Sequence, residues 1–297
     1  MRASALLGLV VILLGGSISG QETTKLPPVF LNHFYIVIDP ATYQDIERNP
    51  FVRSKFAVTE RRTTRRSDMS YTGLYLYGTN TYFEFFDPSS HTSGQVGFSG
   101  IAFGVDQAGG LQAIGRALSS NFTVEQEPVT RQYQEKQIPW FYLGGQEDFP
   151  EDAGLAVWLM EYHPRFLAEW NPQANGTDQG VSRKQVLQRY AAVLKDIPDT
   201  PYLEDVVALT IAVNEAGRGR LADLCKLLGY SERTVGDGRV LRGPGVELRI
   251  LPQTGGLQGI QAITMRVGGK PTEQAEFRFG AKSVLRFRGD GLATWSF

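Results

Sequence analysis

The feature that most constrains the fold of this chain is one order of strands and helix that recurs along the sequence. Residues 30–38 alternate as a half-buried strand does and stop at Asp39-Pro40, and a helical stretch follows at 41–48. The next expected strands are 56–63, 71–77 and 81–86. The first unit is therefore predicted to be βαβββ.

The same order follows again. The second unit is expected to have a strand at 97–105, a helix capped by Asp106 and running to Leu118, and strands at 122–131, 138–143 and 154–162. Helical stretches at 165–170 and 182–196 form an insertion. The third unit is expected to have a strand at 206–213, a helix at 215–228 and strands at 235–241 and 246–251. Strands at 260–267, 277–279 and 284–287 suggest a fourth unit that has lost its helix.

Two polar positions recur with the units. The first strands align through Asp39, Asp106 and Asn214, which sets Gly100 and Ala208 at the place of His33. Each last strand holds a glutamate inside an apolar run that ends at proline, namely Glu84, Glu161 and Glu247. Three such glutamates at matching places favour a shared role over chance.

These motifs carry a resemblance. Leu31-Asn32-His33-Phe34-Tyr35-Ile36-Val37-Ile38-Asp39 with Tyr82-Phe83-Glu84-Phe85-Phe86 resembles the vicinal oxygen chelate superfamily, of the glyoxalase and bleomycin-resistance type, and also an exported, uncharacterised glyoxalase-like group. The resemblance implies an α+β fold in which tandem βαβββ units form cupped mixed sheets, with a helical insertion between two paired halves. The expected division is a signal peptide at 1–20, a paired glyoxalase-like domain at 29–163, the insertion at 164–203 and a second, partly degenerate domain at 204–297.

The resemblance also implies a metal site. Its ligands would be His33, Glu84 and Glu161, and the divalent ion Zn, Mn, Fe, Ni or Co. Gly100, at the fourth ligand position, offers no side chain. Glu161 and His163 are the candidate catalytic residues, and the pocket is expected to be lined by Tyr35, Tyr82, Phe86 and Leu159.

Each of these residues has a plainer interpretation. A histidine at the start of a strand is more often hydrogen-bonded within the structure than a ligand, and His163 fits the rim of a sheet. Glu84 is harder to explain this way, because burying an unpaired carboxylate between Phe83 and Phe85 is costly. Arg61, Arg62, Arg65 and Arg66 form a basic cluster, either a solvated hairpin or an anion gate over the pocket.

Two functions therefore stay open. One is a metal-dependent enzyme with lyase, isomerase or dioxygenase chemistry on a small oxygen-rich molecule. The other is a non-catalytic protein of the same fold that binds or sequesters a small molecule. Residues 204–297 are alternatively a surface for forming a homo-oligomer or for binding a partner.

Composition and the N-terminus bound the location and the partners. Arg2, an apolar run at 5–14 and small residues at 15–20 are typical of a secretory signal, and the run is too short to span a membrane. We therefore expect export to the periplasm or beyond, with no membrane span after cleavage. A net charge of −1 gives no reason to expect a nucleic-acid partner. Asn121 and Asn175 are glycosylation acceptors only in a eukaryotic host.

Overall fold

The computed structural model describes residues 26–118, 122–146, 148–172, 180–194, 198–269, 271 and 275–297. The predicted signal peptide and both glycosylation acceptors lie outside these residues. Within them, no helix combines the length and the apolar character needed to cross a membrane.

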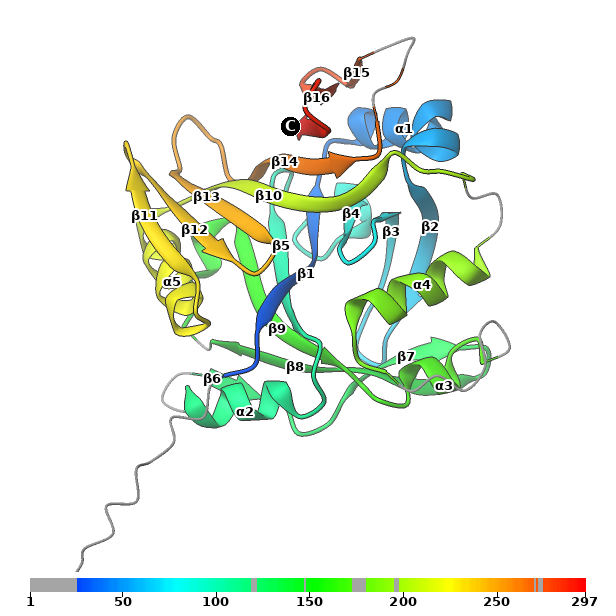
Figure 1. Ribbon diagram of the computed structural model, residues 1–297, viewed down its shortest axis with the longest axis vertical. Coiled ribbons are helices and arrows are strands. Elements are labelled where there is room, and N and C mark those ends of the chain that lie inside the picture. Colours follow the sequence, from blue (N-terminus) through cyan, green and yellow to red (C-terminus); the bar gives the residue numbers. More distant parts are fainter. Residues whose placement is uncertain are drawn as a thin grey trace, which may run out of the picture.

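The first half of the chain forms a nine-stranded mixed sheet (Figure 1). The strands follow the order β2-β3-β4-β1-β5-β9-β8-β6, and β7 pairs with β8. Their bounds are β1 Val29–Val37, β2 Val58–Arg65, β3 Ser70–Tyr77, β4 Tyr82–Phe86, β5 Ser99–Val105, β6 Phe122–Val124, β7 Val129–Tyr133, β8 Lys136–Gln146 and β9 Leu155–Tyr162. Its helices are α1 (Pro40–Arg48), the π-helical turn η1 (Val52–Phe56), α2 (Gly110–Ala117) and the short turns η2 (Pro88–Ser90) and η3 (Glu151–Ala153).

Two helices, α3 (Phe166–Glu169) and α4 (Arg183–Val193), precede an eight-stranded second sheet. Its order is β11-β12-β13-β10-β14-β17-β16-β15. The bounds are β10 Leu203–Val213, α5 Glu215–Leu227, β11 Ser231–Val235, β12 Gly238–Gly243, β13 Val246–Pro252, β14 Gly259–Val267, β15 Glu276–Phe279, β16 Ser283–Phe287 and β17 Leu292–Ser296. Mixed sheets built from tandem βαβββ units confirm the predicted fold class.

Strand register relates the units to one another. The first strands β1 and β5 run antiparallel with Phe34 opposite Ile101, and each is parallel to the last strand of its own unit. In the second sheet, β10 and β14 take the same antiparallel arrangement about Leu209 and Ile263. Each sheet is therefore a pair of units joined through their first strands.

The fourth unit has no helix among its described residues, and this reverses its later strands. In the first unit, helix α1 carries the chain back along the sheet before β2 begins. The last strand of the unit, β4, then runs parallel to β1. Without a crossover helix, β14 and β17 run antiparallel. The fourth unit therefore keeps the strand order of the others but not their directions.

The aligned polar residue after the first strand caps the following helix in two of the three units that have one. The side chain of Asp39 accepts a hydrogen bond from Thr42 N at 3.0 Å, with Pro40 opening α1, and Asn214 accepts from Gly217 N at 2.8 Å. The prediction that Asp106 caps α2 was wrong. That helix begins at Gly110, and Asp106 instead accepts hydrogen bonds from Arg183 at the start of α4.

Both sheets bury side chains in one core. It joins Phe34, Phe83 and Phe85 of the first sheet to Leu209 and Trp295 of the second. The division at 29–163, 164–203 and 204–297 stays a prediction. The core includes residues on both sides of it.

Candidate functional site

A cavity of about 360 Å³ opens on the face of the first sheet that is turned away from this core, here called the inner face. Its walls are mainly aromatic and come from β1, β3, β4, β8 and β9 and from the loops after β2 and β4. The lining residues are His33, Tyr35, Arg66, Met69, Tyr71, Glu84, Phe86, His91, Thr92, Trp140, Phe141, Leu143, Ala156, Val157 and Trp158.

Strand alternation puts the side chains of His33 and Glu84 on this face. His33 and Tyr35 of β1 lie beside Tyr82 and Glu84 of the parallel strand β4. Their neighbours Phe34 and Phe83 point to the core on the opposite face. The motif that carried the resemblance therefore forms one wall of the cavity.

His33 is held as a neutral hydrogen-bond acceptor. Its Nδ1 donates to Asn32 Oδ1 at 2.9 Å, and its ring stacks on Tyr82 with centroids 4.6 Å apart. Burial lowers the pKa of His33 from 6.5 to about 3, because the charged imidazolium would lose its hydration. With the proton on Nδ1, Nε2 keeps a free lone pair.

Glu84 is held as a neutral donor. Burial raises the pKa of its carboxyl group from 4.5 to about 8, against the opposing charge of Arg62 and a hydrogen bond from Tyr75. Its Oε1 lies 4.0 Å from His33 Nε2, which is too long for a hydrogen bond. Because burial disfavours charge on both groups, we assign them as an acid and an acceptor facing each other across a gap, not as an ion pair.

The positive charge of Arg62, which acts on Glu84, is paired with another carboxylate. The guanidinium of Arg62 binds the carboxylate of Glu60 at 2.8 Å and the hydroxyl of Tyr77 at 3.0 Å. Tyr77 stacks in turn on Tyr190 of α4, with centroids 5.1 Å apart. The inserted helix α4 thereby covers the inner face beside the cavity (Figure 1).

The prediction that Glu161 joins His33 and Glu84 was wrong. Glu161 points to the opposite face of the sheet, where its carboxylate accepts hydrogen bonds from Gly109 N at 2.8 Å and Leu111 N at 2.9 Å. It caps the start of α2, where a negative charge also complements the helix dipole. Leu159 shares that face and lies in the core, so it does not line the cavity.

Register explains the error. Glu84 pairs with Tyr35, whose counterpart in the second unit is Ala102, and Ala102 pairs with Trp158. Trp158 is therefore the true counterpart of Glu84, and Glu161 lies three positions further along the strand. Three is an odd number, so the side chain falls on the other face.

The fourth ligand position is filled by a ring. A Cβ atom at Gly100 would lie 2.2 Å from Tyr35 Cε1 and 2.9 Å from Trp158 Cζ3. Gly100 therefore lets Tyr35 and Trp158 occupy the space in which a metal ligand would stand. His163 lies beyond the end of β9, where its Nδ1 accepts from Arg165 N, and it does not reach the cavity lining.

The residues present do not fit the metal that the fold implies. Three or more protein ligands are usual for such an ion, and the four equivalent positions here hold His33, Glu84, Gly100 and Trp158. Across the described part of the chain, no group of three or more His, Cys, Asp or Glu side chains is placed to hold a metal ion. In the second sheet, Ala208 and Arg249 stand at the places of His33 and Glu84.

Several residues of the cavity were not predicted from the sequence. Trp158 was hidden by the misaligned glutamate, and a register built outward from the pairing of the first strands would have found it. His91, in the loop after β4, also lines the cavity and lies 4.8 Å from the ring of Tyr35, centroid to centroid. Tyr35 and Phe86 line the cavity, whereas Tyr82 lies behind His33.

The four arginines of the predicted basic cluster lie in different surroundings and do not form one site. Arg62 is half-buried on the inner face, Arg66 lies at the cavity and binds Asp68, Arg65 is exposed, and Arg61 points to the other face of β2. Alternation along a strand separates neighbours in this way. Only Arg66 stands where an anion gate was expected.

Comparison with solved structures shows a shared fold. A hypothetical protein from Staphylococcus aureus has 11% identity and a TM-score of 0.54, over 88% of this chain and 99% of that one. The 2,2',3-trihydroxybiphenyl 1,2-dioxygenase of Sphingomonas wittichii strain RW1 has 12% identity and a TM-score of 0.41, over 84% and 75%. An extradiol ring-cleaving dioxygenase from B.fuscum has 11% and 0.39, over 93% and 74%. None of these similarities establishes an activity for this chain.

The strand order and the paired units agree with the fold that the sequence resemblance implied. A search of curated proteins finds no match. A family model described as "Family of unknown function (DUF5829)" matches residues 31–297, which include the strand of His33, the strand of Glu84 and the whole second sheet. The protein therefore belongs to this family of unknown function.

Proposed function

We propose that this protein binds a small molecule in the cavity of the inner face, through a hydroxyl or enol group that bridges Glu84 and His33, without a resident metal. One observation carries the proposal. A carboxyl donor and an imidazole acceptor lie 4.0 Å apart on the wall of an aromatic cavity.

The gap fits one oxygen atom. An oxygen about 2.8 Å from both Glu84 Oε1 and His33 Nε2 would form an angle of about 90° between its two hydrogen bonds. A hydroxyl group would accept a hydrogen bond from the protonated carboxyl group of Glu84 and donate one to Nε2 of His33. A methyl ether could make only the first of these bonds.

The remaining walls favour a flat, apolar molecule. Tyr35, Tyr71, Phe86 and Trp158 present rings to the cavity, and its volume suits a ligand of modest size. Phenols and stable enols combine these two properties. The donor set disfavours the metal-dependent chemistry that the resemblance implies, and it favours the binding or sequestering alternative.

Calorimetry with matched ligands tests the proposal. We expect phenols to bind the wild-type protein about tenfold to a hundredfold more tightly than their methyl ethers, because an ether leaves His33 Nε2 without a donor. Glu84→Ala should lose this preference. Glu247→Ala, which removes a strand glutamate of the second sheet that does not line the cavity, should keep it.

Two results would contradict the proposal. The first is equal binding of phenols and ethers by wild type. The second is stoichiometric metal in protein purified without chelator that disappears in Glu84→Ala, since this would show that two protein ligands suffice to hold an ion.

We further propose that the protein is exported, on the strength of the N-terminal segment alone. The charge at Arg2, the apolar run and the small residues after it support this. N-terminal sequencing of the protein from its own host should then give a start near residue 20. An intact Met1 in the mature protein would refute export by cleavage.

A further inference from the structure

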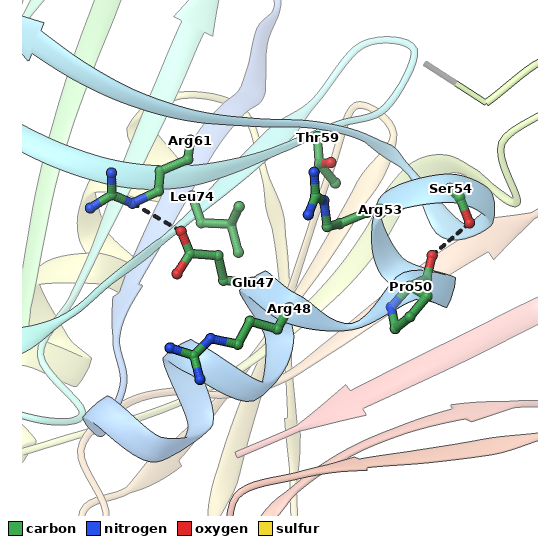
Figure 2. Close-up of a pocket in the computed structure, with 8 residues that line it drawn as sticks. All are labelled: Glu47, Arg48, Pro50, Arg53, Ser54, Thr59, Arg61 and Leu74. Atoms are coloured by element: carbon green, nitrogen blue, oxygen red, sulfur yellow. Dashed lines mark hydrogen bonds and ion pairs between the residues drawn. The ribbon is translucent and has the colours of Figure 1, made fainter. Parts of the chain in front are cut away.

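A second hollow, of about 540 Å³, lies where α1, η1 and β2 meet (Figure 2). We call it the arginine groove. It is lined by Glu47, Arg48, Pro50, Arg53, Ser54, Thr59, Arg61 and Leu74.

The arginine groove is separate from the cavity of the inner face. Arg61 and Thr59 point away from that face, whereas Arg62, the next residue, packs on it against Tyr75 and Tyr77. Leu74 of β3 also belongs to the core face. The proposed function therefore makes no use of this groove.

Positive charge in the groove exceeds negative charge. Three guanidinium groups face one carboxylate, and that carboxylate is engaged, since Glu47 Oε1 lies 2.9 Å from Arg61 Nε. Figure 2 shows this pair on one side of the hollow, with the guanidinium groups of Arg48 and Arg53 unattached. In the part of the chain that the structure describes, no acidic side chain lies within 4.0 Å of either group.

This excess of positive charge is unusual on the surface of this protein. Most other surface arginines bind a neighbouring acid, as Arg165, Arg218, Arg220, Arg242, Arg278, Arg286 and Arg288 do. The chain as a whole has a net charge of −1. Residues 48–66 nevertheless hold seven basic side chains and one acidic side chain, Glu60. Two unpaired arginines meeting a third in one hollow are therefore an exception to the surface pattern.

The geometry points to a binding site for a phosphate monoester. Guanidinium groups present paired N–H donors that match the oxygens of phosphate, and groups on several sides suit a tetrahedral anion better than a planar carboxylate. Three positive side chains and one negative one leave two positive charges, which a phosphate monoester dianion would balance. The hydroxyl of Thr59 adds a neutral donor on the wall formed by β2.

Titration with glycerol 3-phosphate at low salt tests this site. We expect saturable binding by wild type, at least tenfold weaker binding by the double variant Arg48→Gln/Arg53→Gln, and at least tenfold weaker binding of acetate than of the phosphate. The matched control is Arg233→Gln/Arg266→Gln, which removes the same charge from two exposed arginines on the second sheet. That control should bind as wild type does.

The phosphate monoester could belong to a lipid headgroup or to a soluble metabolite. Vesicles of phosphatidylcholine with and without phosphatidic acid distinguish these two sources. Retention on phosphatidic acid that needs Arg48 and Arg53 would assign a lipid headgroup, and binding of the soluble ester alone would assign a free metabolite. Both results support the site. It would be overturned by no saturable binding to either probe, by equal losses in both double variants, or by acetate binding as well as the phosphate.

Discussion

At neutral pH the inner cavity holds a protonated carboxyl group and an uncharged imidazole, each because burial penalises the charged form. This pairing differs from a metal site, in which the ion would keep the carboxyl group ionised. Its consequence is a donor and an acceptor fixed in position before any ligand arrives. Such preorganisation lowers the entropy lost on binding.

The two groups give stability opposite dependences on pH. The pKa of Glu84 is higher in the folded state, about 8 against 4.5, so its contribution is full below pH 4.5 and is lost as pH rises to 8. The pKa of His33 is lower in the folded state, about 3 against 6.5, so its contribution is full above pH 6.5 and is lost as pH falls to 3. The free energy of unfolding should therefore decline by about 2 kcal/mol between pH 6.5 and 8.

Urea denaturation at pH 6.5 and 8 measures this decline. Glu84→Gln should remove most of it, because the amide does not titrate. A variant that declines as steeply as wild type would assign the effect to another group.

Residue types could be predicted better than residue positions. Alternation within one strand put His33 and Tyr35 on the same face, and the resemblance added Glu84 to the same site. The partner from the second unit could not be found this way. Choosing Trp158 over Glu161 needs the strand register, which long-range pairing sets and which the similarity of Glu84 and Glu161 obscured.

At the scale of elements, the glutamate that was expected to bind metal has a structural role. Glu161 is 3% exposed, and both its oxygens accept hydrogen bonds from the start of α2. A helix start buried without acceptors is costly. Here a strand residue supplies what Asp106, the expected cap, does not.

Glu161→Ala should lower the free energy of unfolding by about 2–4 kcal/mol, because it leaves two N–H groups without their charged acceptor. Ligand affinity at the inner cavity should not change, since this side chain lies on the other face. Glu161→Gln, which keeps one accepting oxygen, should cost less. Chemical denaturation and calorimetry on the three proteins measure both effects, and a loss of binding at unchanged stability would refute the structural role.

Element boundaries were predicted correctly only where the turn residues between elements were recognised. The expected strand at 235–241 is instead a hairpin, with Gly236 at φ 56° between β11 and β12. The Gly-Asp-Gly sequence at 236–238 is itself a turn signal. The last strand, β17, escaped prediction, although Trp295 on it is one of the largest buried side chains.

At the scale of the whole molecule, the second sheet completes the core of the first. Trp295 of β17 is fully buried, with its ring centroid 5.1 Å from that of Phe85 and 5.6 Å from that of Phe56. Its Nε1 donates to Ser283 Oγ at 2.9 Å. A side chain two residues from the end of the sequence thus packs behind the strand that carries Glu84.

Trp295→Ala should therefore destabilise both sheets together, by about 3–5 kcal/mol, because it opens a large cavity in the shared core. The other three tryptophans, Trp140, Trp158 and Trp170, all precede the second sheet, so fluorescence of this variant reports on the first half alone. Far-UV circular dichroism reports on both halves. The two transitions should coincide at a denaturant midpoint below that of wild type, and Trp295→Phe should recover most of the loss. If fluorescence kept the wild-type midpoint while the dichroism signal fell earlier, the first sheet would be stable without the second, and the shared core would not be the basis of its stability.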